Sequence, residues 1–294
     1  MEKEVLDCYL KAGATAKGAL ALAREIVREG ASASEVAERV EGFVRSEGCT
    51  PAFPLNISVD ADAAHYTPAP GDDVVFKAGQ VVKVDVGVHK DGYIADTAIS
   101  IEISTNTWKR LIEASATAVE RALALVRAGM PISALSEVIE RTIRSSGYRP
   151  IENLTGHYLG RHVIHAGGNI PNVKGGVSGV LREGDVIAIE PFATPGAGRV
   201  DGSRQGNIYR LLDPRGSLTL DLKRTHDELR KRFSTLPFAS RWVPEVRQAT
   251  LQELIRKQAL MRYPVLTDVK NGIVSQAEHS AIVTKNGAMV YTRD

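Results

Sequence analysis

Apolar residues recur at helical spacing in several segments of the chain. The first covers residues 4–29, and the second runs over 32–47 behind a Ser-Ala-Ser-Glu sequence that resembles a capping box. The same periodicity predicts four more helices at 107–127, 133–145, 221–233 and 245–257. Runs rich in β-branched residues predict strands near 54–59, 81–88, 93–103, 150–165 and 185–193. Helices and strands are interleaved through the whole chain, which indicates a mixed fold of both.

Two of the predicted strands form a hairpin that carries a pair of aspartates. The strands flank a His-Lys-Asp-Gly sequence, in which Asp-Gly is a turn signal. A two-residue turn at 90–91 places Asp85 directly opposite Asp96, and a turn at 91–92 makes them diagonal neighbours. Both registers put the two carboxylates on one face of the hairpin.

The hairpin alone leaves two interpretations of these aspartates open. A three-residue loop would send them to opposite faces, and solvated aspartates on the outside of an antiparallel sheet are ordinary. Two carboxylates held close together are destabilising unless a cation lies between them or one of them is protonated. A metal ion is the natural cation, and the motifs that follow favour it.

Three other motifs supply groups of the same chemical kind. His157 opens a glycine-rich stretch in which His162 and His165 also fall, and glycines let a chain approach a ligand closely. Glu190 and Glu278 each interrupt an apolar, strand-like run. Because an unpaired buried glutamate is costly, both are expected to have a partner.

Composition excludes several classes of protein. The hydrophobic fraction of 43% and the charged fraction of 24% are those of an ordinary globular protein, and 294 residues suffice for a sizeable core. A net charge of +2 is too small to indicate a nucleic-acid or membrane partner. Cys8 and Cys49 lack metal-site spacing and are expected to be free thiols rather than a disulfide. Without a secretory pattern or an apolar run of ~18 residues, a cytoplasmic protein is expected.

Taken together, the motifs resemble methionine aminopeptidase of type 2, in the M24 metallopeptidase family. They run from about residue 50 to the C-terminus in the family's order, at 52–58, 64–68, 84–88, 94–98, 156–157, 164–167, 189–190 and 276–279. The long segment between Glu190 and Glu278 decides the subtype, because type 2 enzymes carry a small helical subdomain there and type 1 enzymes do not. The chain resembles the short, archaeal-type form, which lacks the charged N-terminal extension of eukaryotic members.

This resemblance implies a pita-bread fold, an α+β arrangement in which helices back a curved antiparallel sheet. Residues 1–193 and 261–294 are expected to form the catalytic domain, and 194–260 an inserted helical subdomain of winged-helix type. The basic cluster of the insertion is interpreted as a solvated helix face, with a transient contact to the ribosome as the alternative. It consists of Lys223, Arg224, Arg230, Lys231 and Arg232.

The resemblance also implies a site for two divalent metal ions per chain. Asp85 is expected to chelate one ion, His157 and Glu190 the other, while Asp96 and Glu278 bridge the two. Carboxylate and imidazole ligands without a thiolate suit Co, Mn, Fe or Zn, among which the sequence does not choose. Two such ions would hold a bridging hydroxide ready at neutral pH and polarise the scissile carbonyl.

Further residues match the family's catalytic and substrate positions. Glu190 is expected to accept the proton of the nucleophile, and His165 to donate to the scissile carbonyl or the oxyanion. His65 is expected to bind the substrate peptide or to help protonate the leaving amine. The slot for the methionine side chain is expected near Phe53, Ile164, Ile208 and Tyr263. The remaining histidines, His89, His162, His226 and His279, are expected to be structural, with support of the neighbouring ligand as the alternative for His279. Lys83 is given no role.

The implied activity is hydrolytic removal of the N-terminal methionine of nascent proteins when the second residue is small. One alternative is an X-Pro-specific peptidase of the same fold, although those enzymes usually carry a substantial N-terminal domain and only about fifty residues precede Phe53. The other is a non-catalytic pita-bread binding protein, against which the retention of all five ligands argues. A monomer with no specific nucleic-acid or membrane partner is expected.

Overall fold

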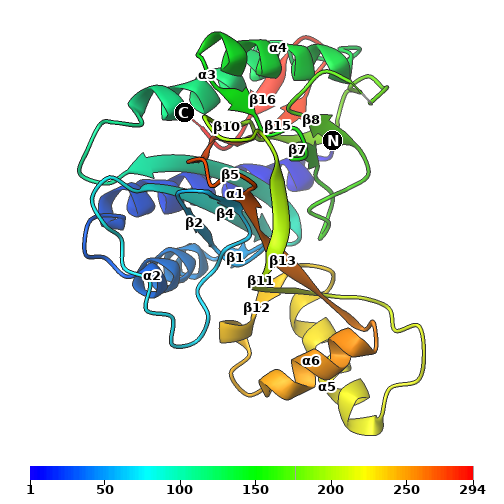
Figure 1. Cartoon of the computed structure of the whole chain (residues 1–294). Coiled ribbons are helices and arrows are strands. Elements are labelled where there is room, and N and C mark those ends of the chain that lie inside the picture. The colour runs from blue at the N-terminus through cyan, green and yellow to red at the C-terminus, as the bar shows by residue number, and fades with distance from the viewer. Residues whose placement is uncertain (176, 294) are drawn as a thin grey trace.

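The computed structural model describes residues 1–175 and 177–293, which form an α+β arrangement (Figure 1). Every strand pairing in this part of the chain is antiparallel. Each helix predicted from apolar spacing has a counterpart within a few residues. The mixed fold class is therefore confirmed.

The N-terminal half packs two helices against four strands. The helices are α1 (Lys3–Ile26) and α2 (Ala33–Ser46), and the strands are β1 (Thr50–Pro51), β2 (Asn56–Val59), β4 (Val81–Lys90) and β5 (Tyr93–Glu102). The strands follow the order β1-β4-β2, with β5 paired to β4. One apolar core joins the inner faces of both helices to β2, β4 and β5. Burial of these apolar faces stabilises the layer pair.

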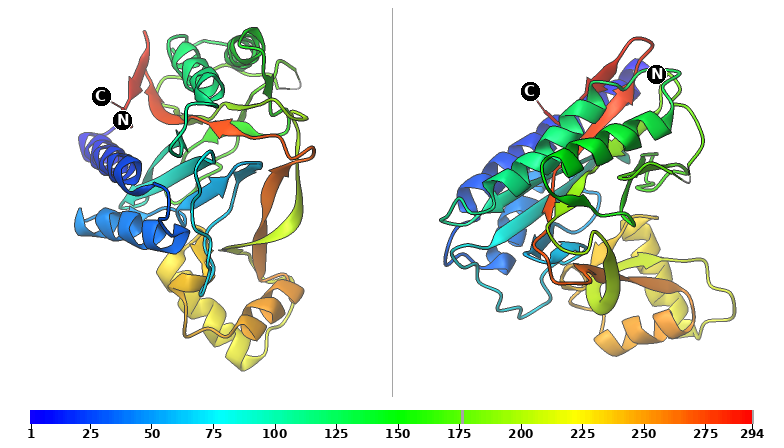
Figure 2. Two further views of the ribbon diagram at one scale, coloured as in Figure 1. Left: turned by 60° about the vertical axis from the view of Figure 1, so that its left-hand side comes forward. Right: turned by 45° about the horizontal axis from the view of Figure 1, so that its top comes forward.

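The second half repeats this plan with a different set of elements. Its helices are α3 (Lys109–Leu123) and α4 (Ile132–Ser145); its main sheet contains β7 (Thr155–Tyr158), β8 (Asn169–Pro171), β9 (Val186–Ile189), β15 (His279–Val283) and β16 (Ala288–Val290). A small sheet of β6 (Arg149–Pro150), β10 (Phe192–Thr194) and β14 (Ser275–Gln276) lies beside it. A second apolar core fills the space between α3, α4 and these strands. Figure 2 shows the strands between the two helix pairs.

A third group of elements, called the helical group below, lies at the bottom of Figure 1. It contains α5 (Leu220–Phe233), a 3-10 helix η1 (Ser240–Trp242) and α6 (Gln248–Arg256), which enclose an apolar cluster of their own. Two long paired strands, β11 (Val200–Leu211) and β13 (Leu260–Asp268), connect it to the body of the molecule. At the body, β13 pairs with β3 (Asp62–Ala64). At the other end, β11 pairs with β12 (Phe238–Ala239). Assignment of 194–260 to a separate subdomain stays a prediction, since β11 belongs to both parts.

The hairpin register settles the alternatives left open by the sequence. Lys90 pairs with Tyr93, so the turn consists of Asp91 and Gly92. Both turn residues have positive φ, 53° and 91°, as a type I′ turn requires. The aspartates are therefore diagonal neighbours rather than directly opposed.

Two local features differ from the sequence-based expectation. Ser32 does precede α2, but its side chain makes no capping hydrogen bond. The N–H of Ala33, the first residue of the helix, donates to the carbonyl of Val74 at 2.9 Å. Glu35 pairs with Arg39 at 3.6 Å rather than completing a capping box. Strands β11 and β13 were not predicted at all, because polar residues and glycines dilute the alternation of β11 and Pro264 interrupts that of β13.

Two smaller expectations concern the cysteines and membrane segments. Cys8 and Cys49 are free thiols, as predicted. No helix within residues 1–175 and 177–293 combines the length and the apolar character needed to cross a membrane.

A glycine pair on the two N-terminal helices tests this packing. A Cβ on Gly13 of α1 would lie 2.0 Å from the backbone oxygen of Tyr291, so Gly13→Ala is expected to destabilise the fold by about 1–3 kcal/mol. Gly42 of α2 is exposed and has open space where a Cβ would lie, so Gly42→Ala is expected to stabilise the fold by about 0.5–1 kcal/mol. Urea unfolding of both variants measures the difference; equal effects would contradict the close approach of α1 to Tyr291.

Candidate metal centre

Strand register brings three carboxylates to one face of the hairpin sheet. Asp85 on β4 pairs with Ala98 on β5, and Asp96 lies two residues before Ala98. The backbone of Glu278 exchanges hydrogen bonds of 3.0 and 3.2 Å with that of Ala98. Because side chains alternate along a strand, these positions share a face.

The second half of the fold supplies the remaining two groups. His157 on β7 pairs with Ala188 on β9, and Glu190 follows two residues later on the same face. The pairing of β15 with β9 continues in a register that sets Glu278 opposite Glu190. Residues far apart in the sequence thus converge from both halves of the molecule.

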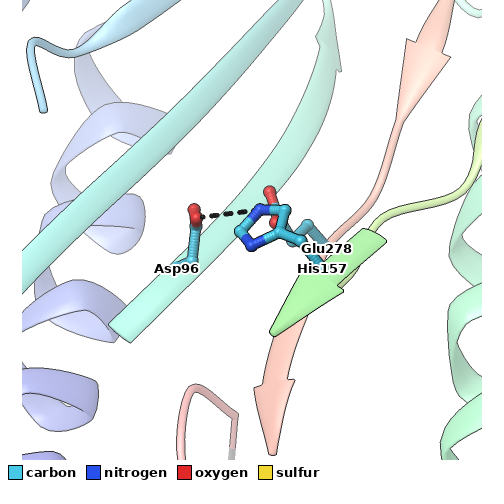
Figure 3. Close-up of side chains that lie close together, drawn as sticks. All are labelled: Asp96, His157 and Glu278. Atoms are coloured by element: carbon cyan, nitrogen blue, oxygen red, sulfur yellow. Dashed lines mark ion pairs between the residues drawn. The ribbon is translucent and has the colours of Figure 1, made fainter. Parts of the chain in front are cut away.

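The groups that converge are close enough to share an ion (Figure 3). Ligand atoms offered by Asp96, His157 and Glu278 lie within 4.8 Å of one another. Nε2 of His157 is 3.6 Å from Oδ2 of Asp96 and 3.5 Å from Oε1 of Glu190. Such a set of carboxylate and imidazole donors suits a borderline divalent cation.

The imidazole of His157 is prepared to act as a ligand. Its Nδ1 lies 3.4 Å from the carbonyl oxygen of Tyr158, which can only accept, so Nδ1 carries the proton. Nε2 is left with a free lone pair that faces the carboxylates. Burial and the neighbouring His165, whose ring centroid is 4.5 Å away, lower the pKa of His157 to about 3. The ring is therefore neutral near pH 7, as metal binding requires.

Little within the described residues compensates the charge of these carboxylates beyond the side-chain amide of Gln276, which donates to Oε2 of Glu278 at 3.3 Å. Burial raises the pKa of Asp85 to about 7. Burial and the neighbouring carboxylates raise the pKa values of Asp96, Glu190 and Glu278 well above their usual range. Among the described residues, Oδ1 of Asp85 and Oδ1 of Asp96 are buried and have no hydrogen-bond partner. A divalent cation would satisfy these oxygens and neutralise the repulsion, so the donor set fits a metal.

All the residues predicted for the site line one cavity of about 200 Å³. They are the five metal-ligand candidates, together with His65, His165, Phe53, Ile164, Ile208 and Tyr263. Ile208 and Tyr263 pair directly across β11 and β13, and the ring of Phe53 rests on Gly87 of β4. The structure thus brings these residues together, while the role of each stays a prediction.

Sequence reasoning gave no role to Asn56, which positions His65. The N–H of His65 donates to Oδ1 of Asn56 at 2.7 Å and holds His65 at a positive φ of 66°. Nδ1 of His65 lies 3.3 Å from the carbonyl oxygen of Pro264, so it carries the proton and Nε2 is an acceptor. Burial lowers the pKa of His65 to about 4, which keeps the ring neutral. The only signal for Asn56 was its place in the Phe-Pro-Leu-Asn motif.

Other cavity residues also lacked a signal of their own. The remaining lining side chains are Asn56, Ala64, Asn153, Leu154, Thr155, Phe192 and Pro237. Pro237 comes from the segment between α5 and α6, so the helical group contributes directly to the cavity.

The histidines expected to be structural lie outside this cavity. His89 and His162 contact each other edge-on at 5.5 Å and line a second cavity. Nε2 of His226 lies 3.0 Å from a backbone carbonyl oxygen, and Nδ1 of His279 lies 3.0 Å from a threonine hydroxyl. Lys83 is buried and donates to a backbone carbonyl at 2.6 Å.

Comparison with known proteins agrees with this geometry. The profile of metallopeptidase family M24 matches residues 7–212. Methionine aminopeptidase of Archaeoglobus fulgidus is 42% identical over 293 residues, and that of Methanocaldococcus jannaschii is 41% identical over 295; each alignment covers 100% of both chains. The solved structure of a thermophilic Arx1 superimposes with a TM-score of 0.85 at 20% identity, covering 99% of this chain and 91% of that one. At this identity the last likeness indicates the fold alone.

Loading the centre with metal is expected to release protons. Because the raised pKa values keep carboxylates protonated in the metal-free protein up to about pH 7, a cation must displace those protons, and its affinity should rise with pH through that value. His157 contributes none, since its pKa of about 3 leaves it neutral. Calorimetric titration with Mn²⁺ at pH 6.5, in two buffers of different ionisation enthalpy, measures the proton count.

The variant Asp85→Asn serves as the comparison, because it removes one of the protonated groups but keeps the shape of the side chain. We expect it to release fewer protons per ion bound than the wild type. Metal binding without proton release, and with an affinity that is constant between about pH 5.5 and 8, would contradict the buried carboxylate cluster.

Proposed function

The chain belongs to metallopeptidase family M24, as a methionine aminopeptidase with the pita-bread fold, and we propose that it removes methionine from nascent proteins whose second residue is small. It is a metal-dependent hydrolase that acts at N-terminal methionine. One observation above all supports the finer proposal: the five ligand candidates, His65 and His165 line the same cavity as the apolar slot. Hydrolysis of the peptide bond and recognition of the methionine side chain can therefore take place in the same cavity.

We assign the five ligands to two divalent ions. Asp85 would chelate one ion, His157 and Glu190 the other, and Asp96 and Glu278 both. The free lone pair of His157 and the unpartnered oxygens of Asp85 and Asp96 support this set. When bound, the ions would lower the pKa of a water molecule and polarise the scissile carbonyl.

Glu190 accepts the proton of the attacking water in this proposal. Its carboxylate is half-buried beside His157, with 3.5 Å between Oε1 and Nε2. The bound ions would keep this carboxylate charged, and a carboxylate beside both the ions and the water is well placed to accept the proton. The register that sets Glu190 opposite Glu278 fixes its position in the cavity.

The two histidines have different tasks in binding the substrate. Since Nδ1 of His65 is engaged by the carbonyl of Pro264, Nε2 can accept the N–H of the substrate's peptide bond. This favours hydrogen bonding over protonation of the leaving amine as the role of His65. His165, whose pKa burial also lowers, is neutral and can donate a ring N–H to the scissile carbonyl.

The apolar wall of the cavity is assigned to the methionine side chain. It combines Phe53, Ile164, Ile208 and Tyr263. A thioether is flexible and polarizable, and packs well in a slot of aliphatic and aromatic side chains. The second residue of the substrate would lie toward the carboxylates, where a larger side chain would clash.

The helices between β11 and β13 support assignment to type 2. Many of their basic residues already pair with acidic neighbours, as Arg230 does with Asp213 at 2.8 Å and Lys231 with Glu228 at 2.9 Å. This agrees with a solvated face. Ribosome contact, the monomeric state and the identity of the metal stay predictions.

Peptide cleavage tests the proposed function directly. Metal-stripped protein, reloaded with Co, Mn, Fe or Zn, should release methionine from Met-Ala-Ser but not from Met-Glu-Ser, and Glu190→Gln should reduce the rate by about 100-fold or more. The exposed Glu183→Gln is the matched control and should keep full activity. Cleavage of Ala-Pro-Ser instead would favour an X-Pro peptidase, and no cleavage with any metal would favour a binding protein.

The apolar slot can be tested through Gly87, which supports Phe53. A Cβ on Gly87 would lie 2.2 Å from the ring of Phe53, so Gly87→Ala must displace the ring. We expect the KM for Met-Ala-Ser to rise by about tenfold, because the wall loses its fit to the thioether. Gly216→Ala, in open space, is the control. An unchanged KM would remove Phe53 from the slot.

A further inference from the structure

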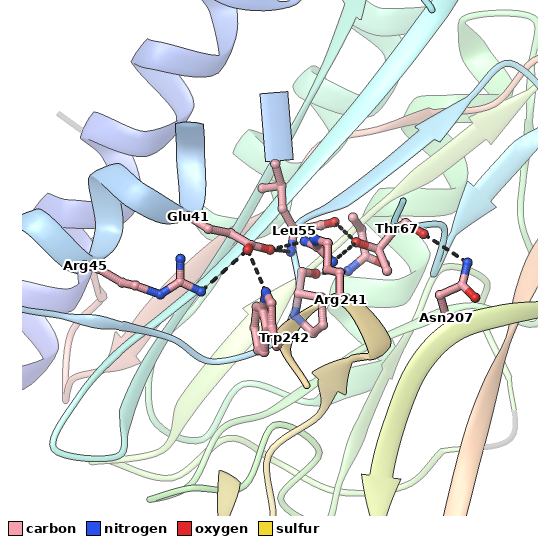
Figure 4. Close-up of polar contacts among 9 residues, drawn as sticks. Glu41, Arg45, Leu55, Thr67, Asn207, Arg241 and Trp242 are labelled. Atoms are coloured by element: carbon pink, nitrogen blue, oxygen red, sulfur yellow. Dashed lines mark hydrogen bonds and ion pairs between the residues drawn. The ribbon is translucent and has the colours of Figure 1, made fainter. Parts of the chain in front are cut away.

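A buried ion pair joins the N-terminal half to the helical group (Figure 4). Glu41 of α2 is 3% exposed and pairs with Arg241 of η1, which comes from the segment between α5 and α6. The indole N–H of Trp242 donates to the same carboxylate at 2.7 Å, and Arg45 lies 3.6 Å from it. The carboxylate of Glu41 thus accepts hydrogen bonds from two neighbouring residues of the helical group, Arg241 and Trp242.

The same pair holds two segments that form walls of the active-site cavity. Glu41 accepts the backbone N–H of Leu55 at 3.1 Å, and Arg241 donates to the hydroxyl of Thr67 at 3.0 Å. That hydroxyl donates in turn to the carbonyl of Leu55 at 2.8 Å. Asn207 donates to the carbonyl of Thr67 at 3.4 Å and so adds a third segment, β11. The hydrogen bonds form a closed network around Arg241.

Each held residue is a close neighbour of a residue that lines the cavity. Leu55 lies between Phe53 and Asn56, and Thr67 follows two residues after His65. Asn207 precedes Ile208, which faces the apolar slot. The metal-ligand candidates, in contrast, lie on β4, β5 and β7, directly after β9 and directly before β15, which these bonds do not reach.

We infer that Arg241, held by Glu41, is a positioning residue that sets the shape of the apolar wall and thereby the preference for methionine. Its guanidinium connects α2 to the loop around Thr67 from within the helical group. Its rigid planar fork fixes the directions of two donors, one toward Glu41 and one toward Thr67, whereas the flexible ammonium of a lysine does not. The helical group thus takes part in substrate selection, although only Pro237 of the segment between β11 and β13 lines the cavity among the described residues. This inference rests on the proposed use of the cavity as the methionine site.

Selectivity at the first residue separates positioning from a purely structural role. We expect the ratio of kcat/KM for Met-Ala-Ser to that for Leu-Ala-Ser to fall at least about fivefold in Arg241→Met, because the wall no longer discriminates between side-chain shapes. Loss of folded protein would lower both rates equally and leave the ratio unchanged. Mn²⁺ affinity, measured by calorimetry, should stay within about twofold of wild type.

Further variants keep the inference falsifiable if Arg241→Met folds poorly. Glu41→Gln/Arg241→Met leaves no unpaired buried charge, so it should be more stable than Arg241→Met while its selectivity stays reduced. Lys231→Met breaks an exposed ion pair with Glu228 in the same helical group, away from the Glu41 network, and should keep wild-type selectivity. Arg241→Lys should not restore the ratio.

The outcomes separate this inference from the proposed function. Wild-type selectivity in Arg241→Met or in the double variant would overturn the role of Arg241 while leaving methionine release intact. Absence of methionine release from the wild type would overturn the proposed function. The inference would then be decided by calorimetry on the metal-loaded wild type and variants. The ratio of the affinity for L-methionine to that for L-leucine should fall in Arg241→Met, and an unchanged ratio would overturn the inference.

Discussion

Electrostatic repulsion among four carboxylates, two buried and two half-buried, is the constraint around which this molecule is organised. Asp85, Asp96, Glu190 and Glu278 share a cavity whose walls raise the pKa values of all four. No arrangement of this kind favours folding unless protons or cations compensate the charge. The antiparallel registers that set these residues on one face therefore serve the centre, and the apolar cores behind them supply the free energy of folding that holds it together.

Local chemistry in the sequence predicted much of the frame. The Asp-Gly turn and the alternation around it were enough to place Asp85 and Asp96 on one face, and the observed register is one of the two expected. The helices followed from apolar periodicity in the same way. Strands β11 and β13 escaped because their pairing depends on close approach: a Cβ on Gly206 would lie 2.5 Å from the backbone oxygen of Tyr263, so glycine is needed where strand propensity argues against it.

The residues of the candidate site were predicted from a resemblance to a known family. Their geometry relative to one another could not be predicted in this way. Sequence does not specify which ring nitrogen of His157 or His65 carries a proton, because that depends on carbonyls of Tyr158 and Pro264 brought close by folding. The link from Arg241 to Thr67 spans 174 positions, a separation at which no periodicity gives information. Such contacts are set by how the layers pack.

The approach of α1 to the end of the chain carries a consequence for biosynthesis. Gly13 fits against Tyr291, the hydroxyl of Tyr291 donates to the carbonyl of Ile94 at 2.7 Å, and Glu278 belongs to the centre itself. During translation, the first helix and the hairpin leave the ribosome long before these partners exist. The protein is expected to act on growing chains. While it is itself still being translated, however, it cannot complete its metal centre, because the segment that carries Glu278 has yet to emerge.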